Sequence, residues 1–472
     1  MPRVSIFSMR RLGFIPPVLL ATLLASCGDP SSTEPDASVA TSIALTPSSL
    51  SMSSPGETVQ LTATVMDQTG VTLPNASVVW SSDDVGVADV SEDGLVTAMG
   101  YGSARVSAAV GSVSASAPVT VETAPETQAV ELLSGLSSPW GMDQLPDGRF
   151  LITQKGGSFV VLASTGETVL STIPSPFAVA SGGQGGLLDV VLDPDFDQNS
   201  TIYWTFSEPG VGAESGLFGT AVGAATLVGD ALQNVAVIYR QHPKTSGQGH
   251  YGSRLVFRSD GTLFVTLGDR QLGSPAQDAT GTLGKVVRIN RDGSVPADNP
   301  RPTGWAPEIW SMGHRNPQGA ALRPGTDDLW LVEHGPQGGD ELNLVAAGAN
   351  HGWPVVSYGC PYGSPVGDAC RIGGGTHAPQ YVEPVSYWVP LSIAPAGMIF
   401  YGGDRFPGWR DNVILGALAG RAVWRVSLAG DVEASRQELF ADLGERIRDI
   451  HEGLDGWIYL VTDSGRFIQI RN

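Results

Sequence analysis

The sequence is short of charge and of cysteine for its length. Of its 472 residues, 16% are charged and only 3 are cysteine, whereas 60 are glycine and 33 are proline. This composition favours many short strands joined by turns over long helices. The charges that are present are mostly acidic, with a formal net charge of -20. An acidic surface argues against nucleic acid as a partner and says little about a neutral substrate.

An apolar run near the N-terminus has the features of an export signal. Three arginines precede the run from Leu12 to Leu24, which is too short to span a membrane comfortably. The sequence Leu-Ala-Ser-Cys that ends at Cys27 resembles the lipobox of bacterial lipoproteins. The resemblance implies cleavage before Cys27 and lipidation of that residue; the alternative is an ordinary signal peptide with an incidental cysteine. For residues 1–27 we therefore expect a lipoprotein signal, and for the mature protein a lipid anchor at a periplasmic, outer-membrane or cell-surface location.

The other two cysteines, Cys360 and Cys370, bracket the short segment PYGSPVGDA. In an exported protein we expect a disulfide that closes this loop. A metal site is the weaker interpretation, because two isolated cysteines do not make a ligand set.

Residues 28–40 are rich in serine, proline and aspartate and predict a flexible tether. Residues 41–122 then show short alternating runs, such as 59–65, separated by turns such as Asp93-Gly94. Roughly seven such strands, with Trp80 near the middle, predict a β-sandwich. The stretch from Trp80 to Ala108 resembles the bacterial Ig-like domains of surface proteins. No catalytic constellation appears in it, so we expect a spacer or a weak adhesion module.

A degenerate repeat begins at residue 128, after a short linker at 123–127, and continues to Asn472. Each unit consists of a turn followed by a short apolar strand. Six units predict an all-β fold, a six-bladed β-propeller with long inserted loops. Two stacked β-sandwiches are the alternative, but they do not explain a repeat carried through six units. The turns are Asp147-Gly148, Asn199-Ser200, Asp260-Gly261, Asp327-Asp328, Asp411-Asn412 and Asp455-Gly456.

A propeller gathers the loops of all its blades around one central channel, so residues far apart in sequence converge there. Glycine-rich loops that carry ionisable groups are therefore the candidates for a site, above all residues 308–354. The candidate side chains and backbone positions are Gln184, His250, Asp269, Arg315, Asn316, Gly335, Pro336, Arg446 and Arg448.

Five stretches that contain these candidates resemble the family of glucose/sorbosone dehydrogenases, soluble sugar dehydrogenases that depend on pyrroloquinoline quinone (PQQ). The stretches are QGGLLDVVLDPDF, GSRLVF followed by LGD, GHRNPQG, EHGPQGGDE and RIRD, in family order. The resemblance covers roughly residues 130–472 and is nearest to the aldose sugar dehydrogenases. It implies oxidation of the C1 hydroxyl of aldoses to lactones, with PQQ and Ca²⁺ as cofactors.

The resemblance also implies residue roles at the cofactor. Arg315 would stabilise the quinone oxygen on which negative charge develops, with Asn316 beside it. Arg446 and Arg448, two positions apart on a strand, would face one side and pair with the cofactor carboxylates. Gln184 and Tyr362 match positions that contact the cofactor.

His250 is the implied general base, which takes the proton of the anomeric hydroxyl while hydride leaves C1. Asp269 would orient and stabilise its imidazole, as a carboxylate does for a catalytic histidine. Without the resemblance, a histidine in a glycine-rich loop is more often structural.

Calcium enters through the resemblance alone. The backbone carbonyls of Gly335 and Pro336 would hold the calcium that touches PQQ, since hard cations take oxygen ligands. A second, structural calcium is implied at Glu341, whose partner in close relatives is a tyrosine; this chain has His351 there. A backbone carbonyl of His351 would serve equally well, whereas a side-chain ligand would not.

One position departs from the family. Where relatives have a lysine for the cofactor, this chain has Ala419, with Arg421 two residues later as a possible substitute. Two other functions stay open: a calcium-dependent lactonase-type hydrolase, or a non-enzymatic carbohydrate-binding or adhesion propeller, which the departures at Ala419 and His351 leave open. The hydrolase would not need Arg315, Arg446 and Arg448 together.

The sequence has no CxxCH motif for haem attachment, so no second redox centre is visible. If the chain oxidises a sugar, we expect its electrons to leave to an external acceptor: a quinone, a cytochrome or an artificial dye.

Overall fold

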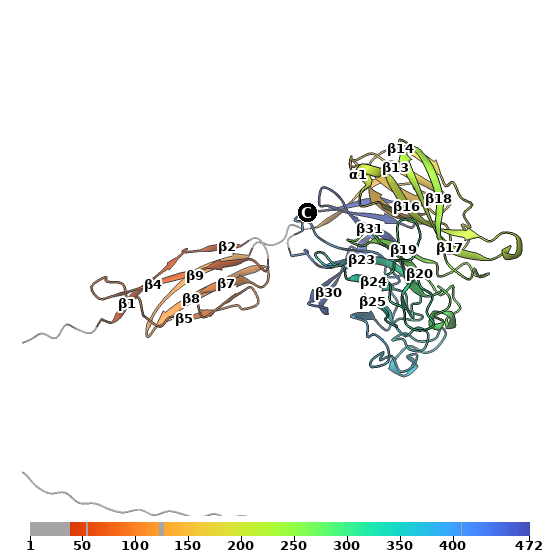
Figure 1. The fold of residues 1–472 in the computed structure, drawn as a ribbon. Helices are drawn as coiled ribbons and strands as arrows, with labels where there is room; N and C mark the ends of the chain where they lie inside the picture. Colours follow the sequence, from red (N-terminus) through yellow and green to blue (C-terminus); the bar gives the residue numbers. More distant parts are fainter. Residues whose placement is uncertain (1–37, 53–54, 122–126, 407) are drawn as a thin grey trace, which may run out of the picture.

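The computed structural model describes residues 38–52, 55–121, 127–406 and 408–472. Over this part of the chain nearly all regular structure is β-strand (Figure 1). The expected signal and the lipidated Cys27 lie outside the described residues. In the described part, no helix is long and apolar enough to cross a membrane.

The first nine strands form a body of their own, in red and orange in Figure 1. One sheet has the order β2-β9-β8-β5, a second the order β3-β7-β6, and β1 pairs with β4. Apolar side chains such as Met52, Val106 and Val119 are fully buried between them. The strands are β1 (Ala40–Thr46), β2 (Leu50–Met52), β3 (Thr58–Gln60), β4 (Thr62–Asp67), β5 (Val79–Ser82), β6 (Ala88–Val90), β7 (Leu95–Ala98), β8 (Gly102–Val110) and β9 (Val113–Val121).

The rest of the described chain forms antiparallel sheets of four strands each. The first three are β11 (Pro139–Gln144), β12 (Phe150–Gln154), β13 (Ser158–Leu162) and β14 (Val169–Pro174); β15 (Leu187–Leu192), β16 (Thr201–Pro209), β17 (Phe218–Val228) and β18 (Ala231–Arg240); and β19 (Gly252–Phe257), β20 (Leu263–Leu267), β21 (Lys285–Ile289) and β22 (Ile309–Met312). The next two are β23 (Pro317–Leu322), β24 (Leu329–Glu333), β25 (Asp340–Val345) and β26 (Ser386–Trp388); and β27 (Pro395–Phe400), β28 (Val413–Ala417), β29 (Val423–Ala429) and β30 (Val432–Leu439).

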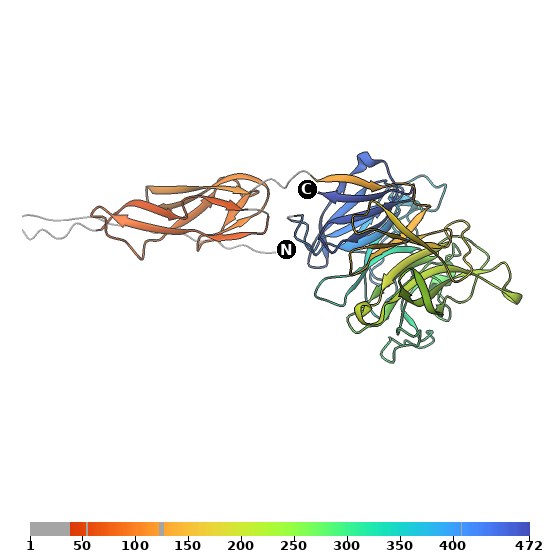
Figure 2. The ribbon, with the colours of Figure 1, turned by 90° about the horizontal axis from the view of Figure 1, so that it is seen from above.

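The last sheet joins the two ends of this region. Its order is β10 (Gln128–Leu133), β33 (Phe467–Arg471), β32 (Ile458–Thr462) and β31 (Ile447–Glu452). Figure 2 shows the orange strand of this sheet beside its blue C-terminal strands. Each of the six turns expected from the sequence precedes the second strand of one sheet in the series β12, β16, β20, β24, β28 and β32.

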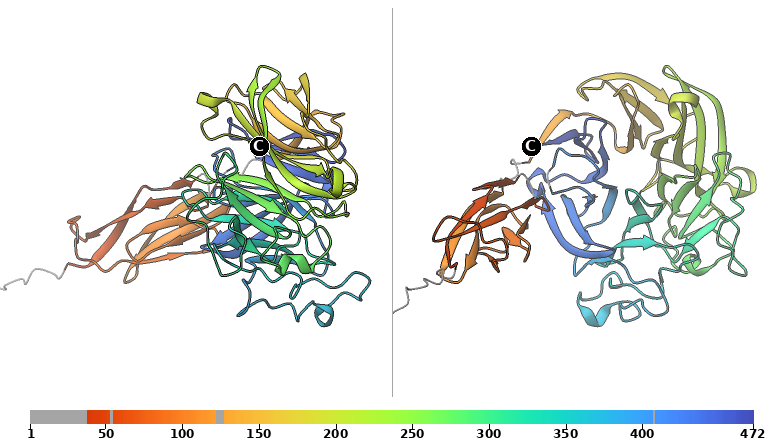
Figure 3. Two further views of the ribbon diagram at one scale, coloured as in Figure 1. Left: turned by 45° about the vertical axis from the view of Figure 1, so that its right-hand side comes forward. Right: turned by 60° about the vertical axis from the view of Figure 1, so that its left-hand side comes forward.

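The sheets follow one another around a ring, as the right-hand view of Figure 3 shows. The strands β11, β15, β19, β23, β27 and β31 each contact the next, and β31 contacts β11. The result is a propeller-like arrangement whose first strands lie innermost. Loops that precede or follow these strands are therefore brought to one shared region.

Short helical turns and one long loop interrupt the strands. The helices are α1 (Phe196–Asn199), η1 (Gly212–Glu214), η2 (Ser274–Gln277), η3 (Asp368–Cys370) and η4 (Ala441–Leu443). The long loop connects β25 to β26 and includes the disulfide between Cys360 and Cys370, whose Cα atoms are 5.2 Å apart.

Neighbouring sheets pack through large apolar side chains. Between the first two sheets, Phe159 lies edge-on to Trp204, with ring centroids 5.4 Å apart, and both are fully buried. Burial of a side chain of this size contributes on the order of 1.5–3 kcal/mol. These apolar layers hold each sheet against the next and so fix the position of the innermost strands.

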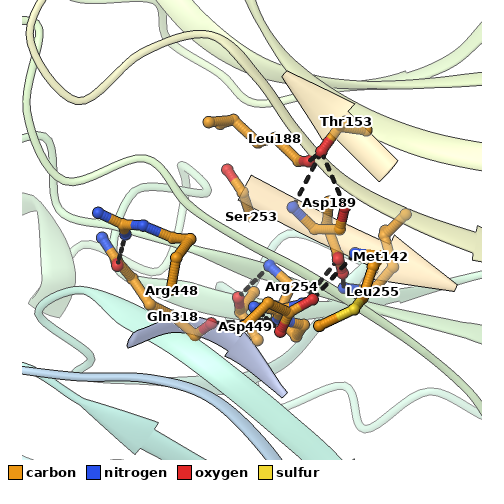
Figure 4. A network of polar contacts seen from close by, with 12 residues as sticks. Met142, Thr153, Leu188, Asp189, Ser253, Arg254, Leu255, Gln318, Arg448 and Asp449 are labelled. Atoms are coloured by element: carbon orange, nitrogen blue, oxygen red, sulfur yellow. Dashed lines mark hydrogen bonds and ion pairs between the residues drawn. The ribbon is translucent and has the colours of Figure 1, made fainter. Parts of the chain in front are cut away.

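A buried ion-pair network crosses the innermost strands (Figure 4). Arg254 of β19 donates from Nη1 to Asp189 of β15 at 2.7 Å and pairs through Nη2 with Asp449 of β31 at 3.0 Å. Its Nε donates to the carbonyl oxygen of Gln318 in β23 at 3.1 Å, and Asp449 accepts from the amide of Met142 in β11 at 3.0 Å. One guanidinium thus links three other sheets directly and a further one through Asp449.

Replacement of Arg254 by methionine leaves two buried carboxylates without their cation. We expect the free energy of unfolding to fall by about 3–5 kcal/mol, the usual cost of breaking a buried pair from one side. Urea denaturation measures the change. The matched control is Arg240→Met, because Arg240 is half exposed in its pair with Glu208; there we expect a loss below about 1 kcal/mol. Equal losses would contradict a structural role specific to the buried network.

Candidate active site

A polar cavity of about 340 Å³ lies where the innermost strands and their loops meet. Its lining comes from five of the four-stranded sheets and the loops beside them, so the ring closure assembles it. The lining residues are Trp140, Lys155, Gly183, Gln184, Gln318, His334, Ala394, Leu418, Arg446, Arg448 and Asp463.

Two of the predicted arginines share one carboxylate at this cavity. Arg446 precedes β31 and Arg448 lies in it; their Nε atoms donate to Asp463 at 2.7 and 2.8 Å. Burial raises the pKa of Asp463, but the two guanidinium groups outweigh it and lower that pKa below the usual value. Arg448 also donates from Nη1 to the side-chain oxygen of Gln318 at 2.8 Å, which fixes its guanidinium plane.

His250 and Asp269 form a buried pair. The imidazole Nδ1 lies 2.7 Å from Asp269 Oδ1, and the exposed fractions of the two residues are 5% and 1%. Burial lowers the pKa of His250, and the nearby Arg315 lowers it further, while the hydrogen bond to Asp269 opposes both. Because Asp269 accepts a hydrogen bond from Nδ1–H, Nε2 has its lone pair available in the neutral ring.

Asp269 is itself held by several donors. The indole Nε1 of Trp353 donates to its Oδ2 at 2.7 Å, and the amide of Gln271 donates to its Oδ1 at 2.8 Å. Burial raises the pKa of Asp269, but these bonds and the one to His250 lower it overall. The carboxylate is therefore ionised and fixed in orientation at neutral pH.

Trp353 also connects this pair to Arg315. The Arg315 guanidinium carbon lies 5.2 Å from the centre of the Trp353 ring. Arg315 donates from Nη1 to the carbonyl oxygens of His334 and Gly335, at 3.1 and 2.7 Å, and from Nη2 to the Tyr362 hydroxyl at 3.2 Å. Its Nε is buried without a hydrogen-bond partner among the described residues.

Asn316 and His334 connect the segment that carries His250 with Arg315. The side-chain oxygen of Asn316 accepts from the amide of Gly252 at 3.2 Å, two residues after His250. Its amide nitrogen lies 3.2 Å from His334 Nδ1, while His334 Nε2 lies 2.8 Å from the Pro395 carbonyl oxygen. This arrangement fixes a neutral His334 that donates from Nε2. Burial, followed by the charge of Arg315, lowers its pKa to about 3.

Gln184, in the loop before β15, contacts this group of residues from another sheet. Its side-chain oxygen accepts from the amide of His250 at 2.7 Å, and it also lines the cavity. The predicted residues Gln184, His250, Asn316 and Arg448 are therefore brought together from four different sheets and their adjoining loops.

A second, smaller cavity lies beside the first and shares His334 with it. Its lining includes Arg315, Gly335, Glu341, His351, Trp353 and His377. Glu341 lies 3.4 Å from His377 Nε2, and both ring nitrogens of His351 are buried without a hydrogen-bond partner among the described residues. Burial raises the pKa of Glu341 and lowers that of His351 well below its ordinary value. In the described part of the chain, no three His, Cys, Asp or Glu side chains are placed to hold one metal ion.

Several residues of the site were not predicted from the sequence. Lys155, Asp463 and Trp353 reach the site from strands or loops that have no motif of their own around them, whereas Gln318 lies inside the GHRNPQG motif and had no predicted role. His334 lies inside the EHGPQGGDE motif, but no role was predicted for it. The suggested substitute Arg421 does not line the cavity: its guanidinium donates to the Gly444 carbonyl at 3.3 Å.

Asp340 is another missed residue, and it positions the backbone of the site. Its Oδ1 accepts from the amide of Gly335 at 2.8 Å, and its Oδ2 accepts from the amides of Ile393 and Ala394 at 2.6 and 2.8 Å. Burial raises its pKa to about 6. It lies inside the EHGPQGGDE motif, but the motif alone does not show that its side chain holds the backbone of this turn.

Residues 136–469 match the glucose/sorbosone dehydrogenase family, and residues 39–121 match the bacterial Ig-like domain, group 2. Among characterised sequences, the chain is 42% identical over 359 residues to the aldose sugar dehydrogenase YliI of Escherichia coli, which covers 74% of this chain and 94% of that protein.

Two solved structures extend the comparison. The apo form of the soluble aldose sugar dehydrogenase of Escherichia coli is 38% identical, with a TM-score of 0.68 over 73% of this chain and 99% of that one. The PQQ-bound aldose sugar dehydrogenase of Streptomyces coelicolor is 25% identical, with a TM-score of 0.60 over 74% of this chain and 99% of that one.

Replacement of Asp269 by asparagine tests the electrostatics of the buried pair. Without the carboxylate, burial and the charge of Arg315 act on His250 unopposed, so we expect its pKa to fall further below the ordinary value. Imidazole chemical shifts followed by NMR against pH measure it, with His250→Gln to assign the signal. In the surface control Asp260→Asn the pKa of His250 stays unchanged. A rise in Asp269→Asn would contradict the arrangement.

Proposed function

The chain belongs to the glucose/sorbosone dehydrogenase family, and from this premise we propose that it oxidises the C1 hydroxyl of aldose sugars to lactones with PQQ and calcium. The observation that carries the proposal is the buried His250–Asp269 pair, set beside Arg315 and a cavity lined by further cations. His250 can act as a base and remove a proton. The fixed positive charges beside it can stabilise an acceptor that gains negative charge in the same reaction.

The lining of the cavity fits PQQ, which carries three carboxylates and a quinone. Arg446 and Arg448 present guanidinium groups suited to carboxylates, and Gln184 adds an amide. The buried Nε of Arg315, which has no hydrogen-bond partner in the described part of the chain, is a free donor. Asn316 and Tyr362, both bonded within this group, complete the proposed cofactor contacts.

When bound, PQQ would supply an ortho-quinone able to accept the hydride from C1. His250 Nε2 would take the proton of the anomeric hydroxyl, and Asp269 would stabilise the imidazolium that results. Because the pKa of His250 is lowered, the imidazole is neutral and able to act as a base at neutral pH. Protonation of His250 removes the base, so kcat/KM falls only when the pH drops below that lowered pKa.

Arg315 would hold positive charge against the oxygen that gains negative charge in the reaction. Its guanidinium is fixed on two sides, by the carbonyl oxygens of His334 and Gly335 and by the ring of Trp353. A cation that is already oriented needs no reorganisation during the reaction, which is why such a group is more effective than mobile solvent.

Calcium is part of the proposal through the backbone carbonyls of Gly335 and Pro336, which are oxygen ligands of the kind it prefers. Asp340 holds the Gly335 amide and so orients this turn. A second calcium would use the Glu341 carboxylate and the backbone carbonyl of His351. The imidazole nitrogens of His351 and His377 do not fit calcium, because they are softer ligands than oxygen.

The remaining parts of the proposal concern the whole chain. We take the six four-stranded sheets to be the six blades of a propeller over residues 128–472, preceded by the Ig-like spacer at 41–122 and the tether at 28–40. The signal at residues 1–27 would direct export of the enzyme, and lipidation of Cys27 would attach it to a membrane. The electrons would pass to an external quinone, cytochrome or dye.

Reconstitution tests the function directly. We expect the chain without residues 1–27 to reduce a dye in the presence of an aldose only after PQQ and calcium are added, and to stop when a chelator removes calcium. Loss of the general base in His250→Gln is expected to lower kcat by about 10²–10⁴-fold while PQQ is retained. Dye reduction in the absence of PQQ, or full activity of the variant, would exclude the mechanism.

Replacement of Trp353 by phenylalanine tests the link between the two catalytic groups. The ring that packs on Arg315 is kept, while the hydrogen bond to Asp269 Oδ2 is lost. We expect kcat to fall by about tenfold, the usual effect of losing one hydrogen bond to a charged group, with little change in PQQ affinity. Stopped-flow reduction and equilibrium dialysis separate the two. A loss confined to PQQ affinity would instead make Trp353 a cofactor contact.

A further inference from the structure

Lys155 is the one cation of the central cavity that has no ion pair among the described residues. It follows β12, lies half-buried, and lines the cavity together with Arg446 and Arg448. Its Nζ donates to the backbone carbonyl of Gly183 at 2.9 Å. A lysine ammonium has three donors, so this single bond leaves two of them for a ligand.

Arg446 and Arg448 differ from Lys155 because each already has an ion-pair partner. Both are paired with Asp463, the single carboxylate of the lining. Three cations against one carboxylate leave the lining with an excess of two positive charges. Because Asp463 is already shared by the arginines, the part of this excess that is free of a fixed partner lies on Lys155.

The environment of Lys155 is costly for a charge in the absence of a ligand. Burial, followed by the positive charge of Arg448, lowers the pKa of Lys155, and Asp463 only partly offsets this. A carboxylate bound in the cavity would relieve that cost, since an opposite charge nearby favours the ammonium form.

Position 419, where the resemblance implies a lysine, has no charged side chain in this protein. Leu418 lines the cavity, and the next residue, Ala419, is exposed at its edge without a charged group. Arg421, two residues further, bonds to the Gly444 carbonyl and does not line the cavity. The loop after β28 therefore supplies no cation, whereas the loop after β12, in a different sheet, supplies Lys155.

We propose that Lys155 binds a carboxylate of PQQ and replaces the cation that position 419 lacks. The assignment rests on the proposed function, because PQQ is the polycarboxylate concerned. The arginine pair and Lys155 would then receive separate carboxylates of one planar ligand. The three cations that face the ligand would then come from the loop after β12 and from β31 and the loop before it, with none from the loop after β28.

The test measures PQQ binding itself, by quenching of tryptophan fluorescence and by equilibrium dialysis, on the chain without residues 1–27 with calcium present. For Lys155→Met we expect the Kd of PQQ to rise about tenfold or more, since a charged hydrogen bond is lost. Lys155→Arg keeps the charge and stays within about threefold of the wild type. The control Lys244→Met, which removes a lysine that is paired with Glu208 and Glu214 and does not line the cavity, leaves the Kd unchanged.

A second variant keeps the test decisive if Lys155→Met is perturbed in its fold. In Lys155→Met/Ala419→Lys, a lysine at the cavity edge recovers a substantial part of the lost affinity, which a general folding defect would not allow. Wild-type affinity in Lys155→Met overturns the Lys155 assignment and leaves the proposed function standing. Failure of the wild type to bind PQQ overturns the proposed function, and this assignment with it.

Discussion

The guanidinium of Arg254 is the point on which the geometry of the site depends. It is buried with Asp189 and Asp449, and its Nε holds the backbone carbonyl of Gln318. The side chain of Gln318 in turn accepts from Arg448 at the cavity. A buried ion pair fixes the positions of its partners, because any arrangement that separates them leaves a charge unpaired in the interior. Here that arrangement sets the spacing of the innermost strands, and through Gln318 it continues into the central cavity.

The charge of the cavity is opposite to that of the molecule. The chain has a formal net charge of -20, yet its central cavity is lined by three cations and one carboxylate. Concentrated positive charge with low-dielectric walls selects a small polyanion over the neutral sugars that outnumber it. The same walls strengthen each carboxylate contact by excluding water. The cavity therefore suits an anionic ligand such as the proposed PQQ, and in the proposed reaction the neutral sugar would bind near His250.

The sequence identified the right stretches but not all the roles within them. The six turns each precede the second strand of a sheet, because turn chemistry and alternating apolar residues are local signals. Asp189, Arg254 and Asp449 all lie inside family motifs, yet their part is structural, which only their pairing across sheets reveals. Lys155 and Trp353 had no motif around them. Their importance comes from contacts between distant segments, and no local pattern encodes such contacts.

Burial acts alike on the two histidines of the site, and their partners decide what each can do. It lowers the pKa of both, so both are neutral at neutral pH. His334 has both ring nitrogens engaged, one by Asn316 and one by the Pro395 carbonyl, so it has no lone pair left for a substrate proton. Among the described residues, the ring of His250 is held only at Nδ1, by a carboxylate that can stabilise the ring once it is charged. Of these two histidines, His250 alone combines a free acceptor nitrogen with a compensating charge, and this is what a general base requires.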